Sequence, residues 1–311
     1  MEEKVIIDCD VGVDDALALI LAFHSPELKV LGVTGVHGNV ALDKVMKNIE
    51  KVLTLLRPPR RTWIAPGADR PLQGKTVHAE SFHGEGGLGG VNIQADEEGD
   101  WWEVFPGSAD ELIIQMARRH PHEITLIAIG PLTNLALALQ RDAEGMGNLK
   151  GVVIMGGAVR TKGNITPHAE FNFFVDPLAA KQVLESGLPI TLVPLDATHQ
   201  VPLTPEVMEE RVRPLGNFIS QFVVEATGYE SRERYFRGGR KASYLHDPLA
   251  VGAVIDPELV RKEKLSISVE ARGGEFNGKS YEVSWGEKNA EVCLEVDREK
   301  FLELFLSRLK G

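Results

Sequence analysis

Near its start the chain reads KVIIDCDVGVDDALALILAFH over residues 4–24. The run from Val5 to Asp8 is short and apolar until its acidic end, so it predicts a buried strand. The run from Asp14 to His24 predicts a helix with two acids in its first turn, where the helix dipole favours negative charge. An apolar strand that leads directly into a helix is typical of a parallel sheet covered on both faces.

The same alternation of strand and helix continues along the chain. Further strands are expected at residues 29–36, 62–65, 124–129, 151–155 and 190–195. Helices are expected at residues 42–57, 108–120, 132–139, 176–185 and 298–310. Residues 205–237 are predicted to be mostly helical, and period-two alternation over residues 264–297 predicts an antiparallel hairpin. Asp247 is expected to cap another helix that has Pro248 at its first position.

These patterns predict the fold class. We expect a single α/β domain over residues 1–311, with an open, mostly parallel sheet and helices on both faces in a Rossmann-like arrangement. A small antiparallel hairpin and a helical insertion complete it. The segment 67–107 is long and irregular, and loops of this length in compact domains are usually functional or disordered.

The charge balance argues against several classes of partner. The 311 residues carry 34 Lys and Arg against 45 Asp and Glu, which gives a formal net charge of -11. Nucleic acids and anionic membrane surfaces favour basic proteins, so we expect neither as a partner. Two cysteines and the lack of a signal-peptide pattern indicate a cytoplasmic protein. No stretch approaches about 18 uninterrupted apolar residues, so no membrane span is expected.

Four carboxylates occupy the eight residues from Asp8 to Asp15. We expect them at the carboxyl end of the first strand, where open α/β sheets place their ligands. Crowded carboxylates repel one another unless a cation neutralises them, and ligands that are all oxygen indicate Ca²⁺ or Mg²⁺. An EF-hand loop that starts at Asp8 is excluded, because its sixth and twelfth positions hold Val13 and Leu19. An acidic loop that only caps a helix is the simpler alternative.

Several further motifs follow in a fixed order. They are Gly38-Asn39, HGEGGLG at residues 83–89, GPLTN at 130–134, MGGA at 155–158, Gly163-Asn164, AEFN at 169–172, VDP at 175–177 and LHDP at 245–248. Together with Asp-x-Asp-x-Gly-x-Asp-Asp at residues 8–15, they resemble the inosine-uridine-preferring nucleoside hydrolases over almost the whole chain. The resemblance implies hydrolysis of the N-glycosidic bond of a ribonucleoside, which gives ribose and a free base.

The resemblance also implies a calcium site and two catalytic residues. Ca²⁺ would be bound by Asp10, Asp15, Asp247 and the backbone carbonyl of Ile129. Asp10 would hold and activate the attacking water beside the calcium, and His246 would assist the leaving base as a general acid or by orienting it. The family usually has Thr where this chain has Ile129, but a carbonyl ligand tolerates that change.

Substrate contacts are implied for side chains from most of the motifs. These are Asp14, Asn39, His83, Met155, Asn164, Glu170, Phe171, Asn172, His246 and Asp247, with Asp8 in a supporting role. Carboxylates and amides suit the hydroxyl groups of a sugar. The basic and aromatic segment 229–244 would flank the base, and the choice between purine and pyrimidine depends on this segment and on the loop around His83. The family is usually homo-oligomeric, so we expect a dimer or a tetramer.

Two other functions stay open at this stage. A magnesium-dependent phosphohydrolase also begins with Asp-x-Asp after a strand, where one Asp is the nucleophile. Against it, Asn164, Glu170 and Asn172 suit neutral hydroxyls and would not favour phosphate. A non-catalytic nucleoside or sugar binder on the same scaffold is the second alternative, although Asp10 and His246 are both present here. The predicted pocket has six acids and no assigned Lys or Arg, so nucleotides should be poor substrates.

Overall fold

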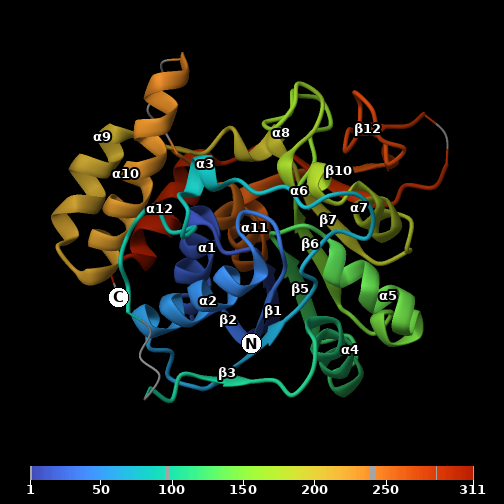
Figure 1. Cartoon of the computed structure of the whole chain (residues 1–311), viewed down its shortest axis with the longest axis horizontal. Coiled ribbons are helices and arrows are strands. Elements are labelled where there is room, and N and C mark those ends of the chain that lie inside the picture. The colour runs from blue at the N-terminus through green and yellow to red at the C-terminus, as the bar shows by residue number, and fades with distance from the viewer. Residues whose placement is uncertain (1, 95–98, 239–242, 285, 311) are drawn as a thin grey trace.

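The computed structural model describes residues 2–94, 99–238, 243–284 and 286–310. Nine strands form one sheet in the order β10-β13-β7-β6-β5-β1-β2-β3-β4 (Figure 1). The strands are β1 Glu3–Cys9, β2 Leu28–Gly35, β3 Thr62–Pro66, β4 Trp102–Val104, β5 Ile124–Ala128, β6 Gly151–Met155, β7 Ile190–Val193, β10 Val260–Leu265 and β13 Ala290–Val296. Every neighbouring pair is parallel except β10 and β13, so the predicted mostly parallel α/β sheet is confirmed.

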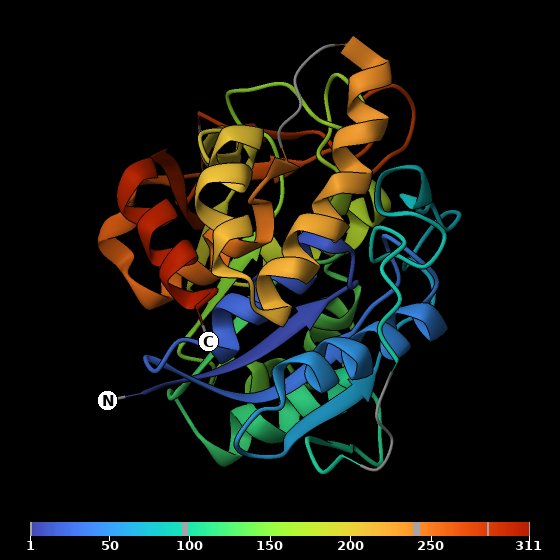
Figure 2. The same ribbon diagram turned by 90° about the vertical axis from the view of Figure 1, so that its left-hand side faces the viewer.

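Helices cover both faces of this sheet (Figures 1 and 2). They are α1 Val13–Phe23, α2 Leu42–Leu56, α3 Glu80–His83, α4 Ala109–Arg119, α5 Thr133–Met146, α6 Phe171–Val175, α7 Pro177–Leu184, α8 Leu195–Thr198, α9 Pro205–Val207, α10 Phe218–Gly238, α11 His246–Ile255 and α12 Arg298–Arg308. Within the described ranges, none is both long enough and apolar enough to pass through a bilayer.

Strand β1 separates two hydrophobic cores. Val5 and Ile7 pack with α1, α2, α10, α11 and α12 on one face, whereas Ile6 packs with α4, α5 and α7 on the other. Successive side chains of a strand point to opposite faces, so an uninterrupted apolar run supplies both cores. Helix α1 lies in the first core with nine of its eleven residues buried, and it packs against α11. The two cores fix the carboxyl end of β1, where the acidic run begins.

Three sequence-based expectations need correction. First, α11 begins at His246 with Leu245 as its N-cap, so Asp247 lies inside the first turn and does not cap the helix. Second, the expected hairpin at 264–297 is divided between two sheets. Its outer parts, β10 and β13, pair at the edge of the main sheet, while β11 (Ile267–Val269) and β12 (Ser280–Glu282) form a separate two-stranded sheet. Third, the irregular segment 67–107 contains α3 and β4.

Candidate active site

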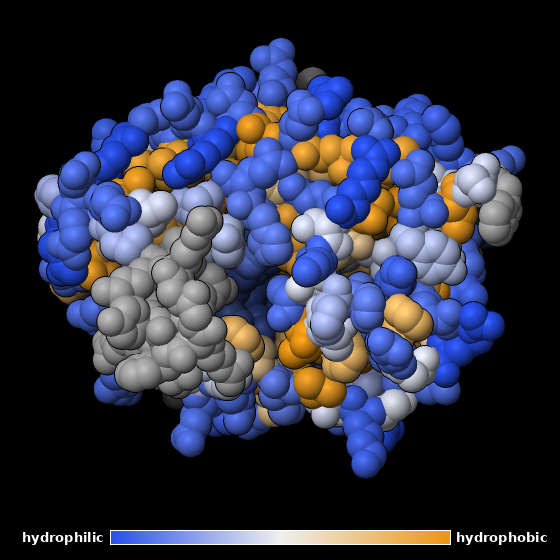
Figure 3. Space-filling view, turned by 90° about the horizontal axis from the view of Figure 1, so that it is seen from above, coloured by the Kyte–Doolittle hydropathy of each residue, from blue (hydrophilic) through white to orange (hydrophobic). Residues whose placement is uncertain are grey.

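A cavity of about 770 Å³ opens at the carboxyl ends of β1, β5 and β6. Viewed from above, this side of the molecule has a hollow near its centre (Figure 3). All ten residues that were predicted to contact substrate line the cavity, together with Ile129. Asp8, Asp10 and Asp15 are almost completely buried beside it. The structure therefore brings together residues from eight separated segments of the chain.

The turn after β1 is folded around the carboxylate of Asp15. That carboxylate accepts hydrogen bonds from the backbone N–H of Asp10 at 3.1 Å and of Gly12 at 2.8 Å, and from Nδ2 of Asn39 at 3.1 Å. The backbone N–H of Asn39 donates to Oδ2 of Asp10 at 2.6 Å. A Cβ atom at Gly38 would lie 2.0 Å from that same oxygen, so only glycine permits this close approach. The strand-end loops of β1 and β2 thus hold Asp10 and Asp15 in place.

The arrangement of carboxylates fits a hard cation. Asp14, Asp15 and Asp247 each offer an oxygen, and these oxygens lie within 4.8 Å of one another. Burial, followed by repulsion from Asp14, Asp15 and Asp10, raises the pKa of Asp247 well above its usual range. Burial and the charge of Asp14 raise the pKa of Asp15 to about 6. A bound cation would remove this penalty, because it favours the ionised carboxylates.

Two further carboxylate oxygens lack a hydrogen-bond donor. Oδ1 of Asp10 and Oδ1 of Asp14 are buried without a hydrogen-bond partner among the described residues, although Nδ1 of His83 lies 3.9 Å from Oδ1 of Asp14. Burial and the charge of Asp15 raise the pKa of Asp10. Unpartnered buried carboxylate oxygens are costly, and cation coordination is one way in which proteins satisfy them. The family resemblance implied Asp10, Asp15 and Asp247 as ligands, whereas among the described residues the oxygens that converge within 4.8 Å belong to Asp14, Asp15 and Asp247, without Asp10.

The carbonyl of Ile129 is close to the predicted sugar site. Asn172 donates from Nδ2 to the carbonyl oxygens of Ile129 at 2.9 Å and of Met155 at 3.2 Å. The amide nitrogen of Asn172 is therefore committed to the ends of β5 and β6, and its Oδ1 is the atom left to accept from a ligand. A carbonyl oxygen has two lone pairs, so Ile129 keeps one acceptor site in this arrangement. Its role as a metal ligand stays a prediction.

Glu170 is fixed as the N-cap of α6. Its carboxylate accepts from the backbone N–H of Asn172 at 2.8 Å, of Gly157 at 2.9 Å and of Phe173 at 3.1 Å. Asn164 holds the same turn, because its Oδ1 accepts from the N–H of Phe171 at 2.9 Å. Burial raises the pKa of Glu170 to about 7. Glu170 is thus a rigidly oriented acceptor at the cavity wall.

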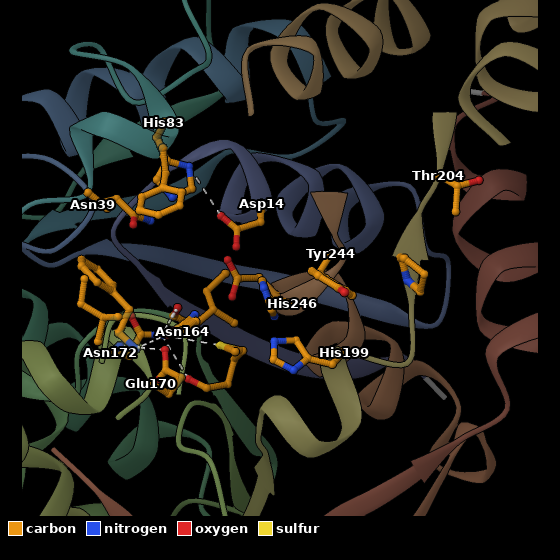
Figure 4. A pocket seen from close by; sticks show the side chains of 18 of the residues that line it. Asp14, Asn39, His83, Asn164, Glu170, Asn172, His199, Thr204, Tyr244 and His246 are labelled. Carbon is orange, nitrogen blue, oxygen red and sulfur yellow. Dashed lines mark hydrogen bonds and ion pairs between the residues drawn. The ribbon is translucent and has the colours of Figure 1, made fainter. Parts of the chain in front are cut away.

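Two histidines approach the cavity from different elements. His83, in α3, accepts from the backbone N–H of Val13 on its Nδ1 at 3.1 Å, so its Nε2 carries the proton when the ring is neutral. Nδ1 of His246 lies 2.7 Å from Oγ1 of Thr198. Figure 4 shows His83 beside Asn39, and His246 beside Tyr244 and His199. The ring centroids of His199 and Tyr244 lie 5.8 and 5.6 Å from that of His246.

Sequence reasoning missed several residues that line the cavity. These are Phe82, His199, Thr204 and Glu206, and Tyr244 was predicted only as part of a segment. Most of the segment 229–244 lies outside the residues whose side chains are described. The missed residues stand outside the recognisable motifs, so no local pattern marked them.

Asp8 is buried beneath the cavity and does not line it. Its Oδ1 accepts from Oγ1 of Thr34 and from Nδ2 of Asn134, the latter at 2.7 Å. Burial raises its pKa to about 7. These contacts tie β1 to β2 and α5 at the level of the acidic run, in keeping with the predicted supporting role.

Comparison with known proteins identifies one family along almost the whole chain. Residues 5–303 match the family described as inosine-uridine preferring nucleoside hydrolase. The pyrimidine-specific ribonucleoside hydrolase RihA of Salmonella schwarzengrund (strain CVM19633) is 37% identical over 100% of this chain and 99% of its own. RihA of Klebsiella pneumoniae (strain 342) is 36% identical, with 99% of each chain covered.

Solved structures agree in fold. The plant nucleoside hydrolase PpNRh1 superposes with a TM-score of 0.93 at 30% identity and full coverage of both chains. The purine-preferring ribonucleoside hydrolase from Gardnerella vaginalis superposes with a TM-score of 0.92 at 29% identity, with 99% of this chain and 98% of that chain covered. The chain therefore shares its fold with these proteins over almost its full length.

Proposed function

Because the chain belongs to the inosine-uridine preferring nucleoside hydrolases, and so is a hydrolase of N-glycosyl bonds, we propose a calcium-dependent mechanism for it that uses Asp10 and His246. The observation that carries this proposal is the convergence of Asp14, Asp15 and Asp247 at one cavity, which Asp14 and Asp247 line together with the predicted sugar-binding side chains. Carboxylate and carbonyl oxygens are the ligands that Ca²⁺ prefers.

The proposed calcium ligands are Asp10, Asp15, Asp247 and the carbonyl of Ile129. Of these, Asp15 and Asp247 belong to the group of converging carboxylates, whose third member is Asp14. When bound, a divalent ion neutralises the crowded carboxylates and lowers the pKa of a nearby water. The unpartnered Oδ1 of Asp10 supports a role for it as the base, because this oxygen has no competing donor. The N–H of Asn39 holds the other oxygen and so orients the group.

The reaction needs one proton to be taken and one to be given. Asp10 takes a proton from water as the water oxygen bonds to C1′ of the ribose. The C1′–N bond breaks, its electron pair stays on the base, and His246 gives the base a proton. Exchange with solvent then returns the proton from Asp10 to His246. The acids of the cavity favour the positive charge that develops on the ribose ring in the transition state.

The sugar is held by side chains whose orientation is already fixed. Glu170 and Asn172 are anchored by backbone hydrogen bonds, and Asn164 is held by the N–H of Phe171. Asp14 presents a carboxylate from the first turn of α1. We assign these four residues to the ribose hydroxyls. Because little ordering is required on binding, the sugar would be positioned at low entropic cost.

The base end of the cavity has a different lining. His199 and Tyr244 supply rings there, and Thr204 and Glu206 lie in the segment before α10, whereas His83 lies against Val13 and Asp14 at the acidic end. The full-length relatives at 36–37% identity are named as pyrimidine-specific, whereas the Gardnerella enzyme at 29% identity is named as purine-preferring. We therefore propose uridine and cytidine as the preferred substrates of this chain.

An assay of ribose release tests the proposed function. The protein is incubated separately with uridine, cytidine, inosine and adenosine, and free ribose is measured. We expect release from uridine and cytidine to exceed release from the purine nucleosides. Binding of nucleosides without any release would favour the non-catalytic binder. Phosphate release from sugar phosphates, without ribose from any nucleoside, would favour the phosphohydrolase.

Nucleotides should be poor substrates. Among the described residues that line the cavity, Asp14, Glu170, Glu206 and Asp247 are acidic and none is Lys or Arg. We expect kcat/KM for uridine 5′-monophosphate to be at least about tenfold below that for uridine, since a phosphate dianion would be repelled. Steady-state kinetics at two salt concentrations check this prediction. The difference in kcat/KM between the two substrates should be smaller at the higher salt concentration. Equal values for the two substrates would contradict the assignment of an acidic cavity.

The assembly is proposed from the family alone. We propose that residues 1–311 act as one domain, which is supported by the nine-stranded sheet that extends without a break from β10 to β4. We also propose a homodimer or homotetramer.

A further inference from the structure

Thr198 lies directly behind the proposed leaving-group residue. Its side chain is fully buried at the end of α8, and its Oγ1 is 2.7 Å from Nδ1 of His246. We infer that Thr198 is a positioning residue, which holds the imidazole of His246 so that Nε2 is presented to the departing base. The inference rests on the proposed function, because it assumes that His246 assists the base.

The hydroxyl of Thr198 is itself held in one place. The N–H of Leu195 donates to the carbonyl of Gly157 at 2.9 Å, and the N–H of Thr198 donates to the carbonyl of Pro194 at 3.1 Å. A β-branched side chain has few χ1 rotamers, so a fixed backbone also fixes the hydroxyl. Within the described part of the chain, this hydroxyl makes its only hydrogen bond to His246.

The contact decides which edge of the imidazole faces the cavity. His246 lines the cavity and is 8% exposed, so one ring edge meets the substrate space. The rings of His199 and Tyr244 pack around it (Figure 4). Packing of this kind confines a ring but does not distinguish its nitrogen edge from its carbon edge. A hydrogen bond to Nδ1 does distinguish them, because a ring turned by 180° would lose it.

A threonine hydroxyl suits this role. It can donate to Nδ1 or accept from it, so the contact persists whichever ring nitrogen carries the proton. The carboxylates of Asp14, Glu170, Glu206 and Asp247 line the same cavity as His246. An additional carboxylate behind the ring would add negative charge to an already crowded site. A neutral hydroxyl orients the ring without that cost.

Two substitutions at one position test the inference. Thr198→Val removes the hydroxyl but keeps the branched shape, and Thr198→Ser keeps the hydroxyl. For the preferred nucleoside we expect kcat of Thr198→Val to fall about tenfold, which is part of the 10²–10⁴-fold range of acid catalysis, while KM stays within about twofold. Thr198→Ser should retain kcat within about threefold. A valine variant as active as the wild type would overturn the inference.

A substrate with a good leaving group separates positioning from general damage. The phenolate of p-nitrophenyl β-D-ribofuranoside departs without protonation, so it needs no donor. Thr198→Val should therefore hydrolyse this substrate at the wild-type rate while it loses activity on nucleosides. Equal losses on both substrates would mean that the threonine is only structural. In a His246→Ala background, Thr198→Val should cause no further loss on nucleosides.

The outcomes distinguish this inference from the proposed function. A wild-type protein that releases no ribose from any nucleoside would refute the function itself. An active wild type with an unaffected Thr198→Val variant would refute only the role of Thr198. If Thr198→Val does not fold, Thr198→Ala supplies the same deletion of the hydroxyl, and the comparison of the two leaving groups applies to it unchanged.

Discussion

Replacing Asp10 with asparagine should lower ribose release from nucleosides about a thousandfold or more. The change is isosteric and keeps an oxygen that can accept from the N–H of Asn39. It removes the negative charge and the proposed base, so it acts on both activation of water and retention of the cation. Steady-state kinetics of the variant in excess calcium would measure how much of the loss of turnover remains when the ion is supplied.

A matched control separates this effect from a change in net charge. Asp69→Asn removes one charge from a side chain that is 77% exposed, and it should leave turnover unchanged. Near-normal turnover of Asp10→Asn would refute its assignment as the base. Loss of turnover in both variants would indicate a general electrostatic effect.

Removal of the cation should abolish activity and destabilise the protein. A ligand at one hundred times its dissociation constant stabilises the folded state by about 2.7 kcal/mol. For a chain of this size, that corresponds to a melting temperature about 5 °C lower in metal-free protein. Scanning calorimetry and ribose release, each with and without added Ca²⁺, measure the two effects. Full activity after exhaustive removal of divalent ions would contradict the proposed mechanism.

The stability that is lost when the cation is removed should depend on pH. Burial raises the pKa of Asp8 to about 7, of Asp15 to about 6 and of Glu170 to about 7. Unfolded carboxyl groups titrate near pH 4, so between about pH 4 and 7 the folded metal-free protein binds more protons than the unfolded chain. Its free energy of unfolding therefore falls as the pH rises through this window.

Calcium should oppose that fall, because it favours the ionised carboxylates. The difference in melting temperature between calcium-loaded and metal-free protein should thus be larger at pH 8 than at pH 5. Asp247→Asn should show a smaller response to calcium at both values. A difference that shrinks with rising pH would contradict carboxylate ligation.

Much of the fold follows from local patterns. The apolar run of β1 predicts a strand that is buried on both faces, and Val5, Ile6 and Ile7 do enter two different cores. Short elements inside the irregular segment could not be predicted in the same way. Strand β4 has three residues and helix α3 has four, which is too few for a period of two or of 3.6 to be recognised.

The candidate site could be predicted where its residues belong to motifs. Asp14, Glu170 and His246 were found in this way, and all three line the cavity. The contact between Thr198 and His246 could not be found, because it joins residues 48 positions apart and neither carries a local signal for the other. Asp247 shows a related limit. The Asp-Pro pair predicts a helix cap, which is wrong, whereas the family resemblance implied a place at the acidic cluster, where the structure has this carboxylate.

The two ends of the cavity come from different parts of the chain. The acidic end is built by loops after β1, β2, β5 and β6, whereas the opposite wall comes from residues 199–206 and from Tyr244. Substitutions in the wall formed by residues 199–206 and Tyr244 can alter the fit to a base while the acidic end is unchanged. Evolution can therefore change the substrate of such an enzyme through substitutions in one wall of the cavity. Relatives named for opposite base preferences can then share one scaffold.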